Sequence, residues 1–147
     1  MKRMTTYSAK DTAVLGAKFA RMLKERDVVI LEGVLGGGKT TFIRGILAGL
    51  GCRSRVLSPS FTLLRHYKKN KIHICHADLY RIKAKDIIGL GLEDYLYSPS
   101  TITFIEWGEK IERYLPRCIK IRFSFLSEAR RAIVFSIKGY PRRRLTI

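Results

Sequence analysis

A glycine-rich segment early in the chain constrains the fold more than any other feature. Residues 33–40 read GVLGGGKT, which fits the P-loop pattern of a glycine, four free positions and then Gly-Lys-Ser/Thr. The aliphatic run VVIL at residues 28–31 predicts a buried strand before this segment. Apolar residues at helical spacing follow it and predict a helix that ends at Gly51. A strand, a glycine loop and a helix in this order predict a nucleotide-binding loop.

The chemistry of this loop follows from its residue types. Glycines let the backbone bring its N–H groups close to phosphate oxygens, and the helix N-terminus adds roughly half a positive charge. Lys39 can reach the β- and γ-phosphates, and the Thr40 hydroxyl can bind Mg²⁺. The alternative is a glycine-rich turn without a ligand. The sequence has no Asn-Lys-x-Asp guanine signature, which favours ATP over GTP.

Length and composition favour one globular domain. The chain has 147 residues, of which 46% are hydrophobic, so we expect a single domain over residues 1–147 with a mobile basic tail at about residues 141–147. No apolar run reaches the roughly 18 residues of a membrane span, and no apolar signal segment opens the chain. Cys52, Cys75 and Cys118 lack metal-site spacing and indicate reduced thiols. We therefore expect a cytoplasmic protein.

The net charge of +17 favours encounters with polyanions. It arises from 29 Lys and Arg residues against 12 Asp and Glu residues. The basic residues are scattered, with short runs at residues 68–71 and 142–144, and no RNA-recognition signature accompanies them. A direct RNA contact and a solvated basic surface are both open interpretations.

Two regions flank the P-loop unit. Before it, Ser8 and Asp11 fit a capping box that opens a helix, which we expect to end near residues 26–27 and to pack on one face of the sheet. After it, residues 55–57 predict a short strand and the proline-containing SPSFT at 58–62 a fixed bend. The hydroxyls in this bend, including Thr62, either face the γ-phosphate or cap a turn.

Acidic residues end two predicted strands. Residues 62–67 and 72–77 predict an antiparallel hairpin, and Asp78 follows it as a candidate for orienting Mg²⁺ or a water. Glu106 follows the apolar strand at 101–105, as in a Walker B motif, and can hold Mg²⁺ or polarise the attacking water. We expect Glu106 to add little to folding. Trp107, the only tryptophan, is expected beside the phosphates.

His73, Cys75 and His76 resemble metal ligands only in composition. In a strand, residues 73 and 75 face one side and residue 76 the other, so their side chains do not converge. Satisfied polar residues are the better interpretation.

The C-terminal half adds short elements. Residues 85–97 are helix-prone but split by Gly89 and Gly91, and residues 110–114 form a short helix stopped by Pro116. Strands at 119–125 and 132–138 pair around a turn from which Arg130 or Arg131 can reach a nucleotide.

Five segments, in this order, resemble the TsaE (YjeE) family. They are residues 33–40, SPSFT at 58–62, HADLYR at 76–81, GLEDY at 91–95 and IEW at 105–107. The resemblance covers nearly the whole chain. It implies a P-loop NTPase-like α/β fold with a mostly parallel central sheet and an antiparallel hairpin, and we expect helices on both faces.

The resemblance also implies a function. Family members are small bacterial ATPases of tRNA threonylcarbamoyladenosine synthesis, with ATP and Mg²⁺ as cofactors. The implied partner is a TsaD–TsaB complex, which modifies the adenosine beside the anticodon of ANN-decoding tRNAs and stimulates weak ATP hydrolysis. The turnover would reset that complex, and tRNA would be contacted indirectly or through the basic surface.

Matching positions carry the implied roles. Thr62 would sense the γ-phosphate. The predicted catalytic residues are Glu106, Asp78 and Lys39, and the predicted metal ligands are Thr40, Glu106 and Asp78. The predicted nucleotide-binding residues are Gly33, Gly36, Gly37, Gly38, Lys39, Thr40, Thr41, Thr62, Trp107 and Arg130. Val34, Ser60 and Gly108 depart from the usual family pattern, but none of them is a proposed ligand.

Two other classes of protein remain alternatives. A small-molecule P-loop kinase would need an acceptor pocket and an arginine-bearing lid, and the sequence offers no convincing lid. A basic RNA-binding module would bind through charge alone, independently of Lys39.

Overall fold

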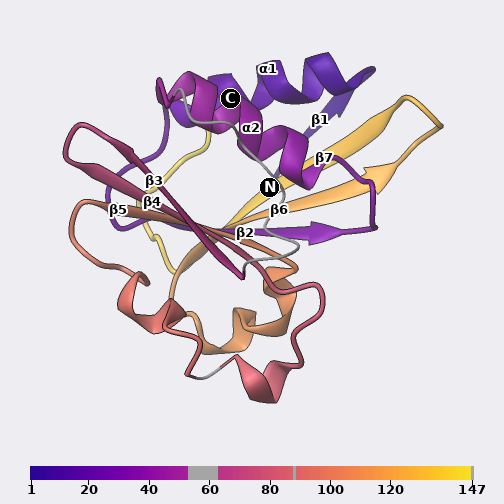
Figure 1. Ribbon diagram of the computed structural model, residues 1–147. Helices are drawn as coiled ribbons and strands as arrows, with labels where there is room; N and C mark the ends of the chain where they lie inside the picture. The colour runs from indigo at the N-terminus through magenta and orange to yellow at the C-terminus, as the bar shows by residue number, and fades with distance from the viewer. Residues whose placement is uncertain (53–62, 88, 147) are drawn as a thin grey trace.

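A seven-stranded mixed sheet forms the centre of the protein (Figure 1). The computed structural model describes residues 1–52, 63–87 and 89–146. Along the sheet the strand order is β1-β7-β6-β2-β5-β4-β3. The strands are β1 (Lys2–Thr6), β2 (Val28–Gly33), β3 (Leu64–Lys69), β4 (Ile72–Asp78), β5 (Thr101–Glu106), β6 (Cys118–Phe125) and β7 (Arg131–Lys138).

The α/β class and the antiparallel β3–β4 hairpin are confirmed, but the prediction of a mostly parallel sheet is wrong for the described residues. The pairs β2–β5, β2–β6 and β4–β5 are parallel, whereas β1–β7, β6–β7 and β3–β4 are antiparallel. Short turns join β3 to β4 and β6 to β7, and such turns allow only antiparallel pairing. The parallel strands therefore occupy the centre, and antiparallel strands form both edges.

Strand β2 runs through the middle of the sheet because its residues are apolar on both faces. Val29 and Leu31 pack into the cluster that contains the two α-helices, while Val28 and Ile30 pack into the cluster on the opposite face. All four side chains have no exposed surface. Because β2 is a central strand, its C-terminal end and the glycine loop that follows lie in the middle of the row of strand ends.

The two α-helices of the described residues cover the same face of the sheet, so the prediction of helices on both faces is wrong for α-helices in this part of the chain (Figure 1). The helices α1 (Ala9–Ala20) and α2 (Lys39–Gly49) pack against each other so closely that a Cβ on Gly45 would lie 2.0 Å from the Ala13 carbonyl oxygen. In the described part of the chain, no helix is long and apolar enough to cross a membrane.

Short 3₁₀ turns cover the other face. They are η1 (Ala84–Asp86), η2 (Leu92–Asp94), η3 (Gly108–Lys110) and η4 (Glu112–Tyr114). Gly89 and Gly91 have φ angles of 90° and 74°, and these left-handed conformations interrupt the helix-prone stretch at residues 85–97 as expected. The segment is therefore too broken for an α-helix, and its apolar side chains, such as Ile87 and Leu92, pack on the sheet from turns.

The N-terminal helix begins as predicted and ends early. The Ser8 hydroxyl accepts a hydrogen bond from the Asp11 N–H at 3.0 Å, which confirms Ser8 as the N-cap, while the Asp11 carboxylate accepts from the N–H of Tyr7 at 3.1 Å rather than from that of Ser8 as in a strict capping box. The helix ends at Ala20 rather than near residues 26–27. Hydrogen-bonded turns continue the helix to Leu23, and a separate turn, in which the Asp27 N–H donates to the Lys24 carbonyl at 3.2 Å, leads into β2.

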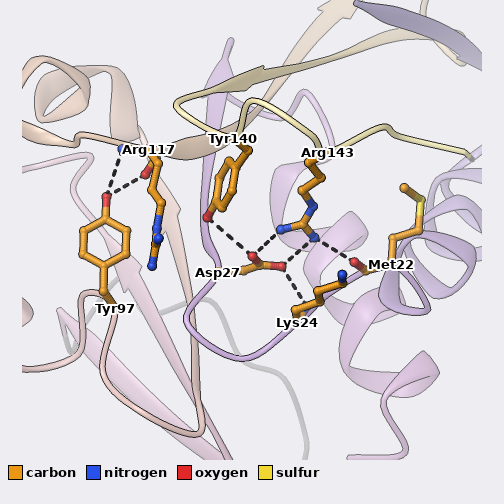
Figure 2. Close-up of polar contacts among 7 residues, drawn as sticks. All are labelled: Met22, Lys24, Asp27, Tyr97, Arg117, Tyr140 and Arg143. Carbon is orange, nitrogen blue, oxygen red and sulfur yellow. Dashed lines mark hydrogen bonds and ion pairs between the residues drawn. The ribbon is translucent and has the colours of Figure 1, made fainter.

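The C-terminal tail is anchored, contrary to the prediction of a mobile segment. Figure 2 shows the Arg143 guanidinium donating hydrogen bonds to both carboxylate oxygens of Asp27 and, at 2.7 Å, to the Met22 carbonyl. The Lys24 N–H also donates to Asp27, at 2.8 Å. Asp27 is only 2% exposed, and a buried carboxylate requires such a partner. The tail thereby joins the end of α1 to the start of β2.

Arg143→Ala is expected to lower the free energy of unfolding by about 3 kcal/mol, because it leaves the Asp27 carboxylate buried without its cation. Arg142→Ala is the matched control, because Arg142 is exposed and its substitution removes the same charge. This variant should change the free energy of unfolding by less than about 0.5 kcal/mol. Urea denaturation of both variants measures the difference. Equal stability of the two variants would contradict this role for Arg143.

Candidate functional site

A cleft of about 500 Å³ lies at the C-terminal ends of β2, β4 and β5. It is bounded by the glycine loop, by the segment after β4 and by the end of β5. Parallel strands bring their C-terminal ends to the same end of the sheet, which is where α/β sheets place binding sites. The lining residues are Leu35, Gly36, Gly37, Gly38, Lys39, Thr40, Thr41, Leu63, Asp78, Tyr80, Arg81, Glu106 and Trp107.

Two glycines give the loop between β2 and α2 its path. Gly33 has a φ of 121°, and a Cβ there would lie 2.1 Å from the Phe123 carbonyl oxygen of β6. Gly38 has a φ of 102° and is the N-cap of α2. L-residues with side chains rarely adopt these conformations, so both positions require glycine. The loop therefore leaves β2 sharply and directs the N-terminus of α2 toward the cleft.

Lys39 provides a buried cation at the base of the cleft. Its Nζ donates hydrogen bonds of 2.8 Å to the carbonyl oxygens of Gly33 and Val34, and it lies 4.0 Å from the centre of the Trp107 ring. Only 4% of the residue is exposed. Burial lowers the pKa of the Lys39 ammonium, and the nearby carboxylates of Glu106, Glu109 and Asp78 oppose that shift. The ammonium is thus held in place by loop carbonyls and an aromatic face.

Glu106 joins three elements at the same edge. The Thr40 hydroxyl donates to its two carboxylate oxygens at 2.9 and 3.1 Å, and His76 Nε2 lies 2.9 Å from Oε1. Thr40 belongs to the first turn of α2, His76 to β4 and Glu106 to the end of β5. The carboxylate is therefore oriented toward the first turn of α2 by two side chains.

The expectation that Glu106 adds little to folding assumed an exposed strand end, and the structure contradicts that assumption. Glu106 is 3% exposed and His76 is 0% exposed. Removing the carboxylate would leave the buried His76 Nε2 without its partner. The buried His76 Nδ1 already has no hydrogen-bond partner among the residues that the structure describes, so that loss would be costly.

Asp78 lies beside Glu106 because the two residues are register partners in the parallel β4–β5 pair. Its Oδ1 accepts a hydrogen bond from the Tyr80 N–H at 2.9 Å. Burial raises the pKa of the Asp78 carboxyl and the neighbouring Glu106 adds to the shift, while the Tyr80 N–H, His76 and Lys39 oppose it. Two carboxylates and the Thr40 hydroxyl thus meet at one end of the cleft.

Trp107 adopts a left-handed backbone conformation, with a φ of 60°, as the chain leaves β5. Its N–H donates to the Leu31 carbonyl of β2 at 2.8 Å. The Trp107 ring lies between Lys39 and Tyr80, whose ring centroid is 4.9 Å away. The indole therefore forms the cleft wall beside the buried ammonium, as its position after the strand predicts.

Most of the predicted site residues line the cleft. Nine of them do so: Gly36, Gly37, Gly38, Lys39, Thr40, Thr41, Asp78, Glu106 and Trp107. Gly33 lies just behind the lining, where its carbonyl binds Lys39. The predicted strand at residues 55–57 and the bend at 58–62, with Thr62, lie outside the described residues.

Arg130 is not brought to the cleft. It lies exposed in the β6–β7 turn, with its guanidinium carbon 5.0 Å from the centre of the Tyr7 ring. Arg131 lies 4.3 Å from the Phe125 ring in the same region. Neither side chain is among the cleft-lining residues.

Sequence reasoning missed several residues of the site. Leu35, Leu63, Tyr80 and Arg81 line the cleft without having been predicted, and His76 binds Glu106 from β4. The signal for His76 was present, since residues two apart in a strand share a face, so His76 faces the same way as Asp78.

The oxygen atoms of the cleft suit a hard cation. Among the described residues, no group of three or more His, Cys, Asp or Glu side chains is arranged to hold a metal by itself. Thr40, Asp78 and Glu106 offer a hydroxyl and two carboxylates, and Mg²⁺ is usually bound by one or two such groups together with phosphate oxygens and water. These residues therefore fit Mg²⁺ as part of a shared site with a phosphate group.

The fold and the site define an α/β protein whose glycine loop, helix N-terminus and paired acids form one cleft. The sequence profile of the family described as "Threonylcarbamoyl adenosine biosynthesis protein TsaE" matches residues 6–133. The chain therefore belongs to the TsaE family.

Individual relatives agree with this assignment. Proteins named "tRNA threonylcarbamoyladenosine biosynthesis protein TsaE" are 36% identical in Treponema pallidum, over 89% of this chain and 97% of the relative, and 39% identical in Rickettsia prowazekii, over 86% and 89%. A crystal structure of YdiB from Bacillus subtilis superposes with a TM-score of 0.80 at 30% identity, covering 96% of this chain and 87% of that one.

Asp78→Asn is expected to stabilise the protein at neutral pH. Because the pKa of Asp78 is raised in the folded state, ionising this carboxyl lowers the stability of the protein. The loss is absent at low pH, where Asp78 is protonated in both states, and it develops as the pH rises above the unfolded-state pKa and through the folded-state pKa. Asparagine stays neutral, and its oxygen can still accept from the Tyr80 N–H.

Thermal unfolding of Asp78→Asn and of Asp86→Asn tests this expectation. Asp86 is exposed, so the control makes the same change in net charge without burial. A higher melting temperature for Asp78→Asn at pH 7, with the advantage vanishing in acid, is expected. A lower melting temperature than that of the control at pH 7 would contradict it.

Proposed function

We propose that this protein binds ATP with Mg²⁺ in the cleft and hydrolyses it in support of tRNA threonylcarbamoyladenosine synthesis. The observation that carries the proposal is the convergence of Lys39, Thr40 and Glu106 at the N-terminus of α2. A P-loop NTPase needs a cation for the phosphates, a hydroxyl for the metal and a strand-end acid, and these three residues supply them.

Phosphate binding would use the backbone of residues 36–41 and the Lys39 ammonium. The N–H groups at the start of α2 and the helix dipole favour an anion at that end of the cleft. The Lys39 donors that now bind two loop carbonyls would turn to the β- and γ-phosphate oxygens. Because Lys39 is buried, its charge acts there with little screening by water.

In hydrolysis, one acidic residue would bind the metal and the other would orient a water molecule. Bound Mg²⁺ would neutralise charge that develops on the phosphate oxygens. The Thr40 hydroxyl and the Glu106 carboxylate would hold it, while Asp78, the register partner of Glu106 on β4, would orient the attacking water or a metal-bound water. The contact of His76 Nε2 with Oε1 would keep the Glu106 carboxylate in its orientation.

The exposed rim of the cleft supports the idea of weak activity that a partner stimulates. Leu35 is 67% exposed, Tyr80 47% and Leu63 37%, so the cleft is open to water along an apolar rim. Closing such a site excludes water and completes the catalytic geometry. We propose that a TsaD–TsaB complex provides this closure in the cytoplasm, and that ATP turnover resets the complex between modifications of tRNA.

The role in tRNA modification rests on the relatives, which carry that function in their names. The basic surface, at +17, would favour approach to a complex that holds tRNA. A small-molecule kinase is less well supported, because the described residues of the cleft lining include one arginine, Arg81, and no arginine-bearing lid.

The experiment is ATP hydrolysis by the purified protein, alone and with TsaD, TsaB and tRNA. Slow release of phosphate alone, with an increase of about tenfold or more in the complex, is expected. Lys39→Ala should abolish both activities. Transfer of phosphate to a small acceptor would instead favour a kinase, and RNA binding unaffected by Lys39→Ala, without hydrolysis, would favour a charge-driven RNA module.

Glu106→Gln is expected to reduce hydrolysis by about 100-fold or more, because a neutral amide binds Mg²⁺ poorly and cannot polarise water. The amide oxygen can still accept from His76 and Thr40, so the variant should remain folded by circular dichroism. Glu93→Gln, an exposed acid in η2, is the control and should keep wild-type turnover. Wild-type turnover in Glu106→Gln would remove this residue from the mechanism.

A further inference from the structure

Lys110, in the 3₁₀ turn η3, binds the backbone of a neighbouring segment with all three of its ammonium donors. Its Nζ donates to the carbonyl oxygens of Leu79, Tyr80 and Ile82 at 2.5, 2.9 and 2.9 Å. A lysine ammonium has three donors and no acceptor, so these bonds satisfy it completely. Surface lysines rarely hold a single conformation of this kind, because ordering the long side chain costs rotamer entropy.

The segment that Lys110 binds forms one wall of the cleft. Residues 79–82 follow β4 directly, and Tyr80 and Arg81 from this segment line the cleft opposite the glycine loop. Leu79 secures one end, since its side chain is 1% exposed and its N–H donates to the Glu106 carbonyl at 3.1 Å. Beyond Leu79 the described backbone contacts are the Tyr80 N–H bond to Asp78 at 2.9 Å, a turn in which the Ile82 N–H donates to the Leu79 carbonyl, and the Lys110 bonds.

This wall is connected to the buried cation. The Tyr80 ring lies 4.9 Å from the Trp107 ring, and the Trp107 ring lies 4.0 Å from Lys39 Nζ. Lys110 lies three residues after Trp107 and donates a hydrogen bond to the Tyr80 backbone carbonyl. Both sides of the Tyr80–Trp107 contact are therefore fixed by one short stretch of chain, residues 107–110.

We propose that Lys110 is a positioning residue that holds the Tyr80–Arg81 wall against Trp107 and thereby sets the affinity of the cleft for its nucleotide. The proposal rests on the proposed function for the identity of the ligand, but the positioning of Trp107 stands apart from it. Lys110 does not reach the phosphate site, where Lys39, Thr40 and Glu106 act. Its loss should therefore weaken binding more than the chemical step.

The test compares Lys110→Met with Lys120→Met. Methionine keeps the length of the side chain and removes the ammonium. Lys120 is the matched control, because its ammonium also pairs with a group in the turns of this face, Glu112 at 2.7 Å, whereas no hydrogen bond or ion pair joins it to residues 79–82. We expect Lys110→Met to raise the KM for ATP about tenfold with kcat within about threefold of wild type, and Lys120→Met to change neither.

A second readout needs no nucleotide. Quenching of Trp107 fluorescence by acrylamide should increase in Lys110→Met, because the Tyr80 ring is no longer held over the indole, and it should be unchanged in Lys120→Met. Trp107 is the only tryptophan, so the signal reports on this position alone.

Tyr80→Ala separates a local effect on the cleft from a loss of folding in Lys110→Met. It removes the Tyr80 ring from the cleft wall and keeps the backbone carbonyls to which Lys110 donates. It should raise the KM to a similar extent, and the double variant should be no worse than either single one. A KM and a quenching constant equal to wild type in folded Lys110→Met, or additive effects in the double variant, would overturn the proposal. If the wild-type protein bound no nucleotide, the proposed function would fail, and the quenching result would still decide the position of Trp107.

Discussion

The Glu106 carboxylate is the contact on which the cleft depends. It accepts hydrogen bonds from Thr40 in α2 and is bonded to His76 in β4, so one side chain ties the helix and two strands together at the edge of the sheet. A carboxylate that is only 3% exposed is costly unless it is fully paired. The orientation of Glu106 is therefore fixed by the fold itself, and it faces the residues that would share a metal ion with it.

The charges of the cleft balance one another within a small volume. The Lys39 ammonium is surrounded by loop carbonyls, an indole face and the carboxylates of Glu106 and Asp78. Burial disfavours the charges of Lys39 and Asp78; the ammonium and the carboxylates offset this cost for each other, whereas the neighbouring Glu106 adds to the cost at Asp78. A bound polyphosphate with Mg²⁺ would fit this balance, because it brings anionic oxygens to Lys39 and a cation to the acids.

Local sequence pattern predicted the elements that position the site. The glycine loop, the strands that end in Asp78 and Glu106, and the β3–β4 hairpin all follow from periodicity and turn residues. Strand β1 was missed because Lys2–Thr6 has little apolar alternation and is paired only through β7. The contacts of Lys110, Arg143 and His76 join residues that are 28 to 121 positions apart in the chain. Such long-range pairs leave no local signal in one sequence.

The most direct test of this account is a titration of Trp107 fluorescence with ATP, with and without Mg²⁺, in the wild type and in Lys39→Ala. The Trp107 ring lies 4.0 Å from Lys39 Nζ, so a nucleotide that draws the ammonium to its phosphates must change the surroundings of the indole. The account predicts a saturable change in emission that Mg²⁺ strengthens and that Lys39→Ala abolishes. Emission that does not respond to millimolar Mg·ATP, in a folded protein, would contradict it.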